Sequence, residues 1–199
     1  MSDSSAKGLH PRTQAVHHGI RRSQYGEMAE AIFLTQGFVY PDAAAAEARF
    51  QGTGPDEFIY ARYGNPTSRM FEDRIAALEG TEDAFATASG MAAVNGALMA
   101  IARPGERIVA ARQLFGSCLY ILNNVLGRYG VEVTLVDGTN LAEWEAAVRP
   151  GTKAVFFESV SNPTLEIMDI AGIARIAHRV GALVVVDNVF ATPLESRAV

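Results

Sequence analysis

The stretch ALVVVDNVFATP, residues 182–193, decides the fold. Five apolar residues, 182–186, end abruptly in the carboxylate of Asp187. An apolar run of this length is typical of a strand that is buried on both faces of a parallel sheet. A buried carboxylate without a partner is very costly, and ligands of open α/β sheets bind just beyond the carboxyl ends of the strands. Asp187 therefore marks a candidate site.

Upstream of this strand, short apolar segments alternate with amphipathic ones from residue 67 onward. The expected strands are 83–89, 106–111, 131–137, 153–159 and 182–187, and the expected helices are 68–80, 90–102, 116–130, 140–148 and 169–181. Helix-capping residues support these boundaries, with Asn140 and Asp169 as N-caps and Gly80 and Gly181 at C-termini. The alternation predicts an α/β fold, with a mostly parallel sheet and helices on both faces.

Residues 1–66 lack this regularity and mix glycine, proline and aromatic residues. One helix is expected at 42–50, with Asp42 as its N-cap. A long irregular segment is unusual inside a compact domain. We therefore expect residues 1–66 to form an arm that wraps a neighbouring subunit, and residues 67–199 to form part of a large domain.

Composition excludes several classes of protein. The formal net charge of −5 gives no basic surface for nucleic acid. No apolar run approaches the roughly 20 residues that span a bilayer, and the polar N-terminus does not resemble a signal peptide. A single cysteine, Cys118, excludes an internal disulfide and a cysteine metal cluster. A cytoplasmic protein without nucleic-acid or membrane partners fits these features.

Two segments could bind a phosphate group. Ser89, Gly90 and Met91 lie between an expected strand and a helix, where backbone N–H groups attract anions; the alternative is a plain turn. Tyr60 and Arg62 lie two residues apart, and on an extended segment their side chains would point the same way and could bind one phosphate. The alternative for this pair is a surface turn with a solvated arginine.

Three further residues follow strand ends. Phe115 could stack on a flat cofactor or belong to the core. Asn162, just before a proline, could donate to an anionic oxygen or shape the turn. Asp187 could keep a ring nitrogen protonated, as pyridoxal phosphate (PLP) chemistry requires, or bond to its own loop. Together these residues describe a phosphate cup, a stacking ring and an acid for a ring nitrogen. Common nucleotide motifs such as GxxxxGK[ST] and GxGxxG are absent, which disfavours an NTP-binding protein.

Five motifs carry a resemblance to the PLP-dependent enzymes of cysteine and methionine metabolism. In family order they are YARYGNPT (60–67), EDRIAALEG (72–80), ASGMAA (88–93), ESVSNPTLEIMDI (158–170) and VVVDNVFATP (184–193). The runs FLTQGFVY (33–40) and LFGSC (114–118) are most similar to the O-succinylhomoserine sulfhydrylase subgroup.

The resemblance implies a type I PLP fold and a role for each candidate. Tyr60 and Arg62 would reach the PLP phosphate of a neighbouring subunit, in a homotetramer with shared active sites. Within one subunit Ser89, Gly90 and Met91 would form the phosphate cup, the last two through backbone N–H groups. Phe115 would stack on the ring, Asn162 would lie near the phenolic oxygen and the substrate carboxylate, and Asp187 would pair with the ring nitrogen.

The implied reaction is γ-replacement in methionine biosynthesis, in which sulfide displaces the acyloxy group of an O-acylhomoserine such as O-succinylhomoserine and gives homocysteine. Within the family, a cystathionine γ-synthase or a γ-lyase is the nearest alternative. A different alternative is a non-catalytic fragment that pairs with a full-length partner.

Two departures from the family pattern stand out. Most relatives have tyrosine where this chain has Phe115, so an acid–base role for that hydroxyl cannot operate here. The lysine that forms the family's Schiff base is expected beyond Val199, and the only lysines are Lys7 and Lys153. We therefore expect a chain truncated before the last strands and the C-terminal domain. Alone it would be inactive, with an exposed apolar edge at 182–186.

Overall fold

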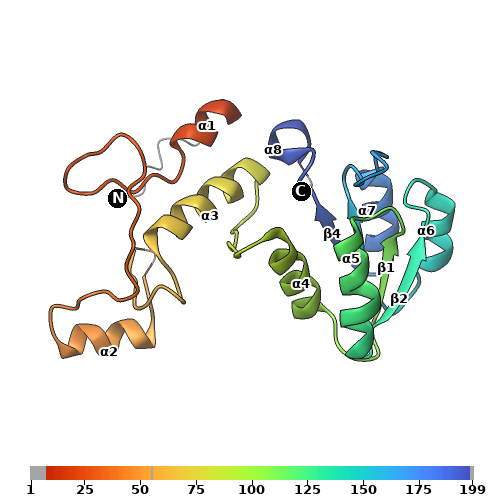
Figure 1. The fold of residues 1–199 in the computed structure, drawn as a ribbon, viewed down its shortest axis with the longest axis horizontal. Coiled ribbons are helices and arrows are strands. Elements are labelled where there is room, and N and C mark those ends of the chain that lie inside the picture. Colours follow the sequence, from red (N-terminus) through yellow and green to blue (C-terminus); the bar gives the residue numbers. More distant parts are fainter. Residues whose placement is uncertain (1–7, 55, 198–199) are drawn as a thin grey trace. The chain divides into compact units, whose positions relative to one another are not determined.

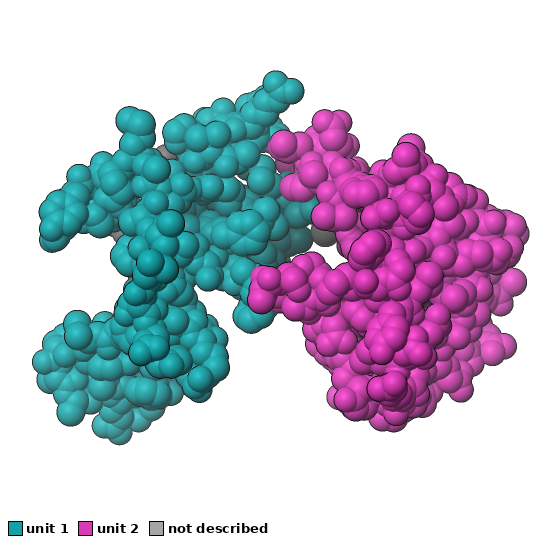
Figure 2. Space-filling view, in the orientation of Figure 1, with its two compact units in different colours: residues 1–86, 199 teal, residues 87–198 magenta. Residues whose placement is uncertain are grey.

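The computed structural model describes residues 8–54 and 56–197, which form two compact units (Figures 1 and 2). The first unit ends at Ala86 and the second begins at Thr87. Among the described residues, no helix is long and apolar enough to cross a membrane.

The first unit consists of three helices joined by irregular segments. They are α1 (Pro11–His17), α2 (Ala43–Gln51) and α3 (Pro66–Glu79). The expected helix at 42–50 is confirmed as α2, because the Asp42 carboxylate accepts the backbone N–H of Ala45 at 2.7 Å. Helix α1 was not expected from the sequence, although Pro11 at its first position is well suited to starting a helix.

Helix α3 holds the segment before it through its charged and apolar side chains. Met70 is buried, and the Arg74 guanidinium donates to the backbone carbonyl of His18 at 2.9 Å. Gly19 has a φ of +78°, and a Cβ there would lie 2.9 Å from the carbonyl oxygen of Met70. Only glycine allows this close approach, so the irregular chain packs directly on α3.

The second unit contains a four-stranded parallel sheet in the order β2-β1-β3-β4. Its strands are β1 (Arg107–Ala111), β2 (Glu132–Val136), β3 (Thr152–Glu158) and β4 (Leu183–Asp187). Every pair of neighbours is parallel. The prediction of a parallel α/β sheet is therefore confirmed.

Helices cover both faces of the sheet (Figure 1). One face packs against α4 (Gly90–Ile101) and α5 (Gly116–Tyr120), which continues as a π-helix over Ile121–Leu126. The other face packs against α6 (Leu141–Ala147) and α7 (Ile170–Arg179), and α8 (Thr192–Glu195) follows β4. Strand β3 serves both cores, since Phe156 joins the first and Phe157 the second. This alternation requires a strand that is apolar on both sides.

One predicted strand is wrong. Residues 83–89 form no strand, and Phe85 is 84% exposed. A strand is stable only when a neighbour takes up its backbone hydrogen bonds, and within the described chain no strand pairs with this segment. The expected apolar edge is confirmed, because β4 is the last strand of the described sheet and Leu183 is 48% exposed.

Replacing Leu98 by alanine tests the packing of α4 on the sheet. Leu98 is fully buried, so Leu98→Ala should lower the free energy of unfolding by about 2–5 kcal/mol. The matched control Leu194→Ala, at a residue 51% exposed on α8, should cost far less. Urea unfolding followed by fluorescence of Trp144, the only tryptophan, reports on the second unit. Equal losses in the two variants would contradict this packing.

Candidate functional site

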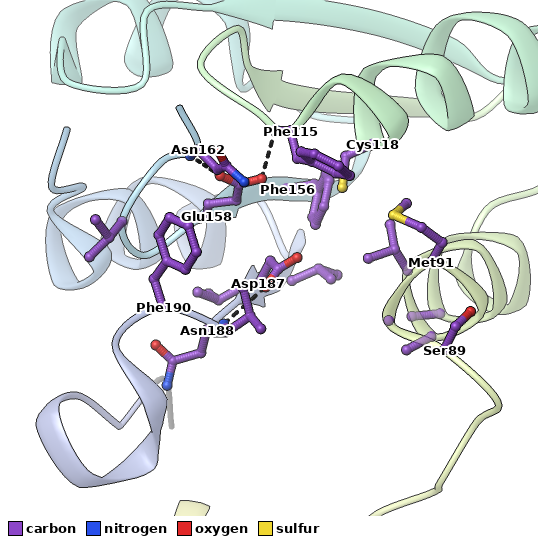
Figure 3. A pocket seen from close by; sticks show the side chains of 18 residues that line it. Ser89, Met91, Phe115, Cys118, Phe156, Glu158, Asn162, Asp187, Asn188 and Phe190 are labelled. Carbon is purple, nitrogen blue, oxygen red and sulfur yellow. Dashed lines mark hydrogen bonds between the residues drawn. The ribbon is translucent and has the colours of Figure 1, made fainter. Parts of the chain in front are cut away.

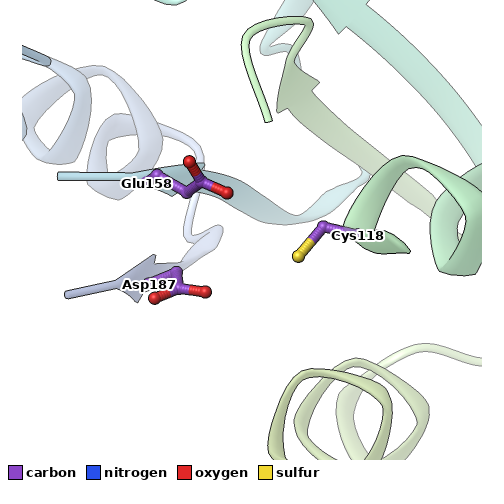
Figure 4. A group of neighbouring side chains, drawn as sticks. All are labelled: Cys118, Glu158 and Asp187. Atoms are coloured by element: carbon purple, nitrogen blue, oxygen red, sulfur yellow. The ribbon is translucent and has the colours of Figure 1, made fainter. Parts of the chain in front are cut away.

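Two carboxylates lie side by side at the carboxyl ends of β3 and β4. Glu158 and Asp187 are register partners across the parallel pair, so their side chains leave the same face of the sheet. One carboxylate oxygen of each residue and the sulfur of Cys118 on α5 all lie within 4.8 Å of one another (Figure 4). The sheet edge thus gathers three ionisable groups that can carry only negative charge.

Glu158 is almost completely buried and is satisfied by backbone donors. It is 3% exposed, and its carboxylate accepts the N–H of Phe115 at 2.7 Å and that of Asn162 at 2.6 Å. Burial raises the pKa of Glu158, the two N–H donors oppose this, and the charge of Asp187 raises the pKa further. The balance favours a carboxyl group that resists ionisation more than a solvated glutamate does.

Asp187 is held more loosely. Its carboxylate accepts the backbone N–H of Val189 at 3.0 Å, the loop-bonding contact considered as an alternative from the sequence. Asp187 also lines the pocket beyond the strand ends (Figure 3). An acceptor oxygen can bind more than one donor, so the loop contact leaves Asp187 able to bind a ligand.

A pocket of about 530 Å³ lies beyond these strand ends. Its walls come from the start of α4, the start of α5 and the segments that follow β3 and β4 (Figure 3). Six of the eight residues predicted from the sequence line it: Ser89, Gly90, Met91, Phe115, Asn162 and Asp187. The second unit therefore brings together the predicted phosphate cup, stacking ring and acid.

The first turn of α4 provides the anion-binding feature of the pocket. The hydroxyl of Ser89 caps the helix by accepting the N–H of Ala92 at 3.2 Å. Helix geometry leaves the N–H groups of Gly90 and Met91 without intrahelical acceptors. A Cβ at Gly90 would meet no heavy atom within 4 Å, so the approach to these donors is open. The site suits an anion.

Phe115 lies at the pocket mouth rather than in the core. It is 42% exposed and precedes the first residue of α5. Figure 3 shows its ring above the side chains of Cys118 and Phe156. The alternative of a core residue is wrong, and the ring has a free surface for stacking.

Tyr60 and Arg62 belong to the first unit. The expectation of an extended segment is wrong, because the N–H of Tyr63 closes a turn onto the carbonyl of Tyr60 at 2.9 Å. The Arg62 guanidinium lies 4.9 Å from the ring centre of Tyr60 and 5.4 Å from that of Tyr63. This arrangement holds an exposed guanidinium between two aromatic rings. The reach of these residues to a neighbouring subunit stays a prediction.

The sequence reasoning missed the roles of Glu158 and Cys118 in this pocket. Glu158 ends a buried apolar strand in the same way as Asp187, so the rule that identified Asp187 also applies to it. Cys118 lies one helical turn after Phe115, which places it beneath the ring. Burial raises the pKa of the Cys118 thiol to about 12, with help from the charges of Asp187 and Glu158.

Charge is distributed unevenly in the pocket. Among its described lining residues the ionisable ones are Cys118, Glu158 and Asp187, and none is lysine, arginine or histidine. The first turn of α4, in contrast, presents the positive end of a helix dipole. The pocket therefore suits a flat ligand with a cationic group at one end and an anionic group at the other.

Comparison with known proteins identifies the family. Residues 12–199 match the sequence profile described as Cys/Met metabolism PLP-dependent enzyme. The chain is 51% identical over 187 residues to O-succinylhomoserine sulfhydrylase of Mycobacterium tuberculosis, covering 94% of this chain and 46% of that protein. It is 41% identical to L-methionine gamma-lyase of Porphyromonas gingivalis, covering 91% and 45%.

A solved structure agrees with these relatives. The metY protein of Campylobacter jejuni, crystallised with N'-pyridoxyl-lysine-5'-monophosphate, superposes with a TM-score of 0.89 at 30% identity and covers 96% of this chain and 47% of that one. The chain thus spans about half the length of the proteins it matches. The resemblance and the PLP-enzyme fold expected from the sequence are confirmed. This chain belongs to the Cys/Met metabolism family of PLP-dependent enzymes.

Proposed function

We propose that this chain forms the cofactor-binding part of an O-succinylhomoserine sulfhydrylase. The enzyme would break the bond between Cγ of O-succinylhomoserine and its ester oxygen, release succinate, and form a bond from Cγ to sulfide, which gives homocysteine, a step of methionine biosynthesis. The observation that carries the cofactor assignment is the charge pattern of the pocket, which has carboxylates at the strand ends and a helix N-terminus at α4. PLP matches this pattern, because its ring nitrogen can be protonated and its phosphate is an anion. The similarity to O-succinylhomoserine sulfhydrylases supports the choice of substrate.

Each lining residue has a task in this proposal. Asp187 would hold a proton on the ring nitrogen, and the N–H groups of Gly90 and Met91 would bind the phosphate at the start of α4, which Ser89 caps. Phe115 would cover one face of the ring, and Asn162 would donate to the phenolic oxygen and the substrate carboxylate. When bound, PLP would supply an electron sink for the reaction.

The phenyl ring of Phe115 limits what this position can do. It excludes water from the ring face, but it has no hydroxyl to donate or accept a proton. Proton transfer at the substrate therefore falls to other groups of the complete enzyme.

The described residues that line the pocket include no lysine that could form a Schiff base with PLP. Lys153 is the second residue of β3, and its Nζ lies 3.9 Å from Glu106, at the opposite end of the strand from Glu158. Lys7 lies outside the described residues. We propose that residues 1–199 alone bind PLP reversibly and do not turn over substrate. The alternative hypothesis, a non-catalytic fragment that pairs with a full-length partner, also predicts that the isolated chain does not turn over substrate.

The proposal also covers the oligomeric state of the enzyme and its place in the cell. We propose a cytoplasmic homotetramer in which Tyr60 and Arg62 contribute to a neighbour's phosphate site. Two observations support an interface in the first unit. No ion pair occupies Arg62 among the described residues, and large apolar side chains there are exposed, including Tyr25, Met28, Leu34 and Val39.

The substrate prediction concerns the complete enzyme that contains this chain. With O-succinylhomoserine and sulfide it should release homocysteine, and cysteine should be a poor acceptor. Chromatographic product analysis separates the alternatives. Cystathionine formed efficiently from cysteine would identify a cystathionine γ-synthase, and breakdown of methionine without an acceptor would identify a γ-lyase.

Asp187→Asn should weaken PLP binding by residues 1–199. Asparagine keeps the size of the side chain but removes the charge that holds a protonated ring nitrogen, so the dissociation constant should rise at least about tenfold. Quenching of Trp144 fluorescence by PLP measures binding. Glu132→Gln is the control, because Glu132 is an exposed residue of β2 that does not line the pocket. Equal affinities of the two variants would contradict the role of Asp187.

Cys118 should be unreactive in the native protein. A thiol with a pKa near 12 holds about a thousandfold less thiolate at pH 8 than one with the ordinary value of 9. The rate of reaction with a thiol reagent should therefore be low at pH 8, rise steadily toward pH 12, and become normal in urea. The single cysteine makes the measurement unambiguous. Rapid labelling of native protein at pH 8 would contradict this assignment.

A further inference from the structure

We infer that Glu158 is a positioning residue, whose carboxylate fixes the stacking ring of Phe115 and the loop of Asn162 at the separation that PLP requires. The inference rests on the proposed function. It concerns how the chain holds two lining residues in place rather than which residues touch the cofactor.

The geometry of Glu158 is that of a clamp. One carboxylate oxygen accepts the N–H of Phe115 at 2.7 Å, and the other accepts that of Asn162 at 2.6 Å. Phe115 lies on the connection from β1 to α5, and Asn162 lies on the connection from β3 to α7. Figure 3 shows Glu158 between the two. A single side chain at the end of β3 thus joins two loops that enter the pocket from different strands.

The contacts are strong enough to orient backbone. Hydrogen bonds from N–H to a carboxylate are shorter and about twice as strong as neutral ones, and these two distances lie at the short end of the range. At 3% exposure, water cannot readily replace the carboxylate as acceptor. Loss of either bond would leave a partly buried backbone N–H without its acceptor and allow its loop to move.

A second link between the loops is weaker. Gln113 donates to Glu166 at 3.4 Å and to Asp137 at 2.9 Å. The contact with Glu166 spans the same two loops, but it is long and lies on partly exposed groups. Glu158 therefore provides the shorter connection of the two.

A purely structural carboxylate would not need to face the ligand. Glu158 lines the pocket, and its neighbours there are Asp187 on β4 and Cys118 on α5. A shift of Phe115 or Asn162 would change the orientation of a bound ring and not only the stability of the fold. Cofactor orientation is thus the property that distinguishes positioning from simple packing.

Two substitutions separate the charge of Glu158 from its reach. Glu158→Gln keeps the length but replaces one acceptor oxygen with an amide group that only donates. Glu158→Asp keeps both oxygens but is one methylene shorter, so it cannot span both loops. Glu132→Gln is the control, because Glu132 is an exposed residue of β2 outside the pocket.

The experiment measures two properties of residues 1–199. Hydrogen exchange by NMR reports the protection of the Phe115 and Asn162 amides, and titration with PLP reports affinity and the induced circular dichroism of the bound cofactor. Both Glu158 variants should speed exchange at one or both amides about tenfold, raise the PLP dissociation constant about tenfold and reduce the dichroism. The control should change none of these, and Trp144 fluorescence confirms that each variant is folded.

Each contrary result has a distinct meaning. Unchanged exchange in both folded variants would overturn the clamp. Faster exchange with unaltered PLP affinity and dichroism would overturn the positioning role. If the wild-type chain bound no PLP, the proposed function would fail together with this role, whereas failure confined to the Glu158 variants would leave the proposed function intact.

Discussion

The pairing of two carboxylates at neighbouring strand ends is the constraint on which the site depends. Like charges brought together in a mostly apolar pocket are costly unless each is satisfied. Glu158 meets this requirement inside the protein by accepting two backbone N–H groups. Asp187 has one such donor, from Val189, and faces the pocket. Glu158 is therefore satisfied within the protein, whereas the carboxylate of Asp187 can accept a further donor from the pocket.

The same sheet that creates this pairing also builds the rest of the pocket. Packing of Leu98 and Phe156 in one core sets α4 against the sheet, and the capped first turn of α4 then opens toward the strand ends. Because the strands are parallel, their carboxyl ends share one edge, and the loops that carry Phe115 and Asn162 meet there. Apolar packing therefore determines the distance between the carboxylates at the strand ends and the N-terminus of α4.

Local patterns in the sequence predicted what depends on local physics. Apolar runs identified β1 to β4, and the caps at Asp42, Asn140 and Asp169 identified helix starts that the structure confirms. The strand predicted at 83–89 is wrong for a non-local reason, since the residues of a segment do not indicate whether another strand is present to pair with it. The clamp at Glu158 could not be predicted from local patterns, because one of its two donors, the N–H of Phe115, lies 43 residues away along the chain.

A phosphate bound at the start of α4 would need positive charge to balance it. In the second unit the described pocket offers backbone N–H groups there, but no cationic side chain. A helix N-terminus carries only about half a positive charge. Arg62 has the properties that the missing cation needs: it is exposed, it is held between the rings of Tyr60 and Tyr63, and no carboxylate pairs with it among the described residues. In the proposed shared site, one chain would supply the dipole and another the full charge, and assembly would then be a condition of tight cofactor binding.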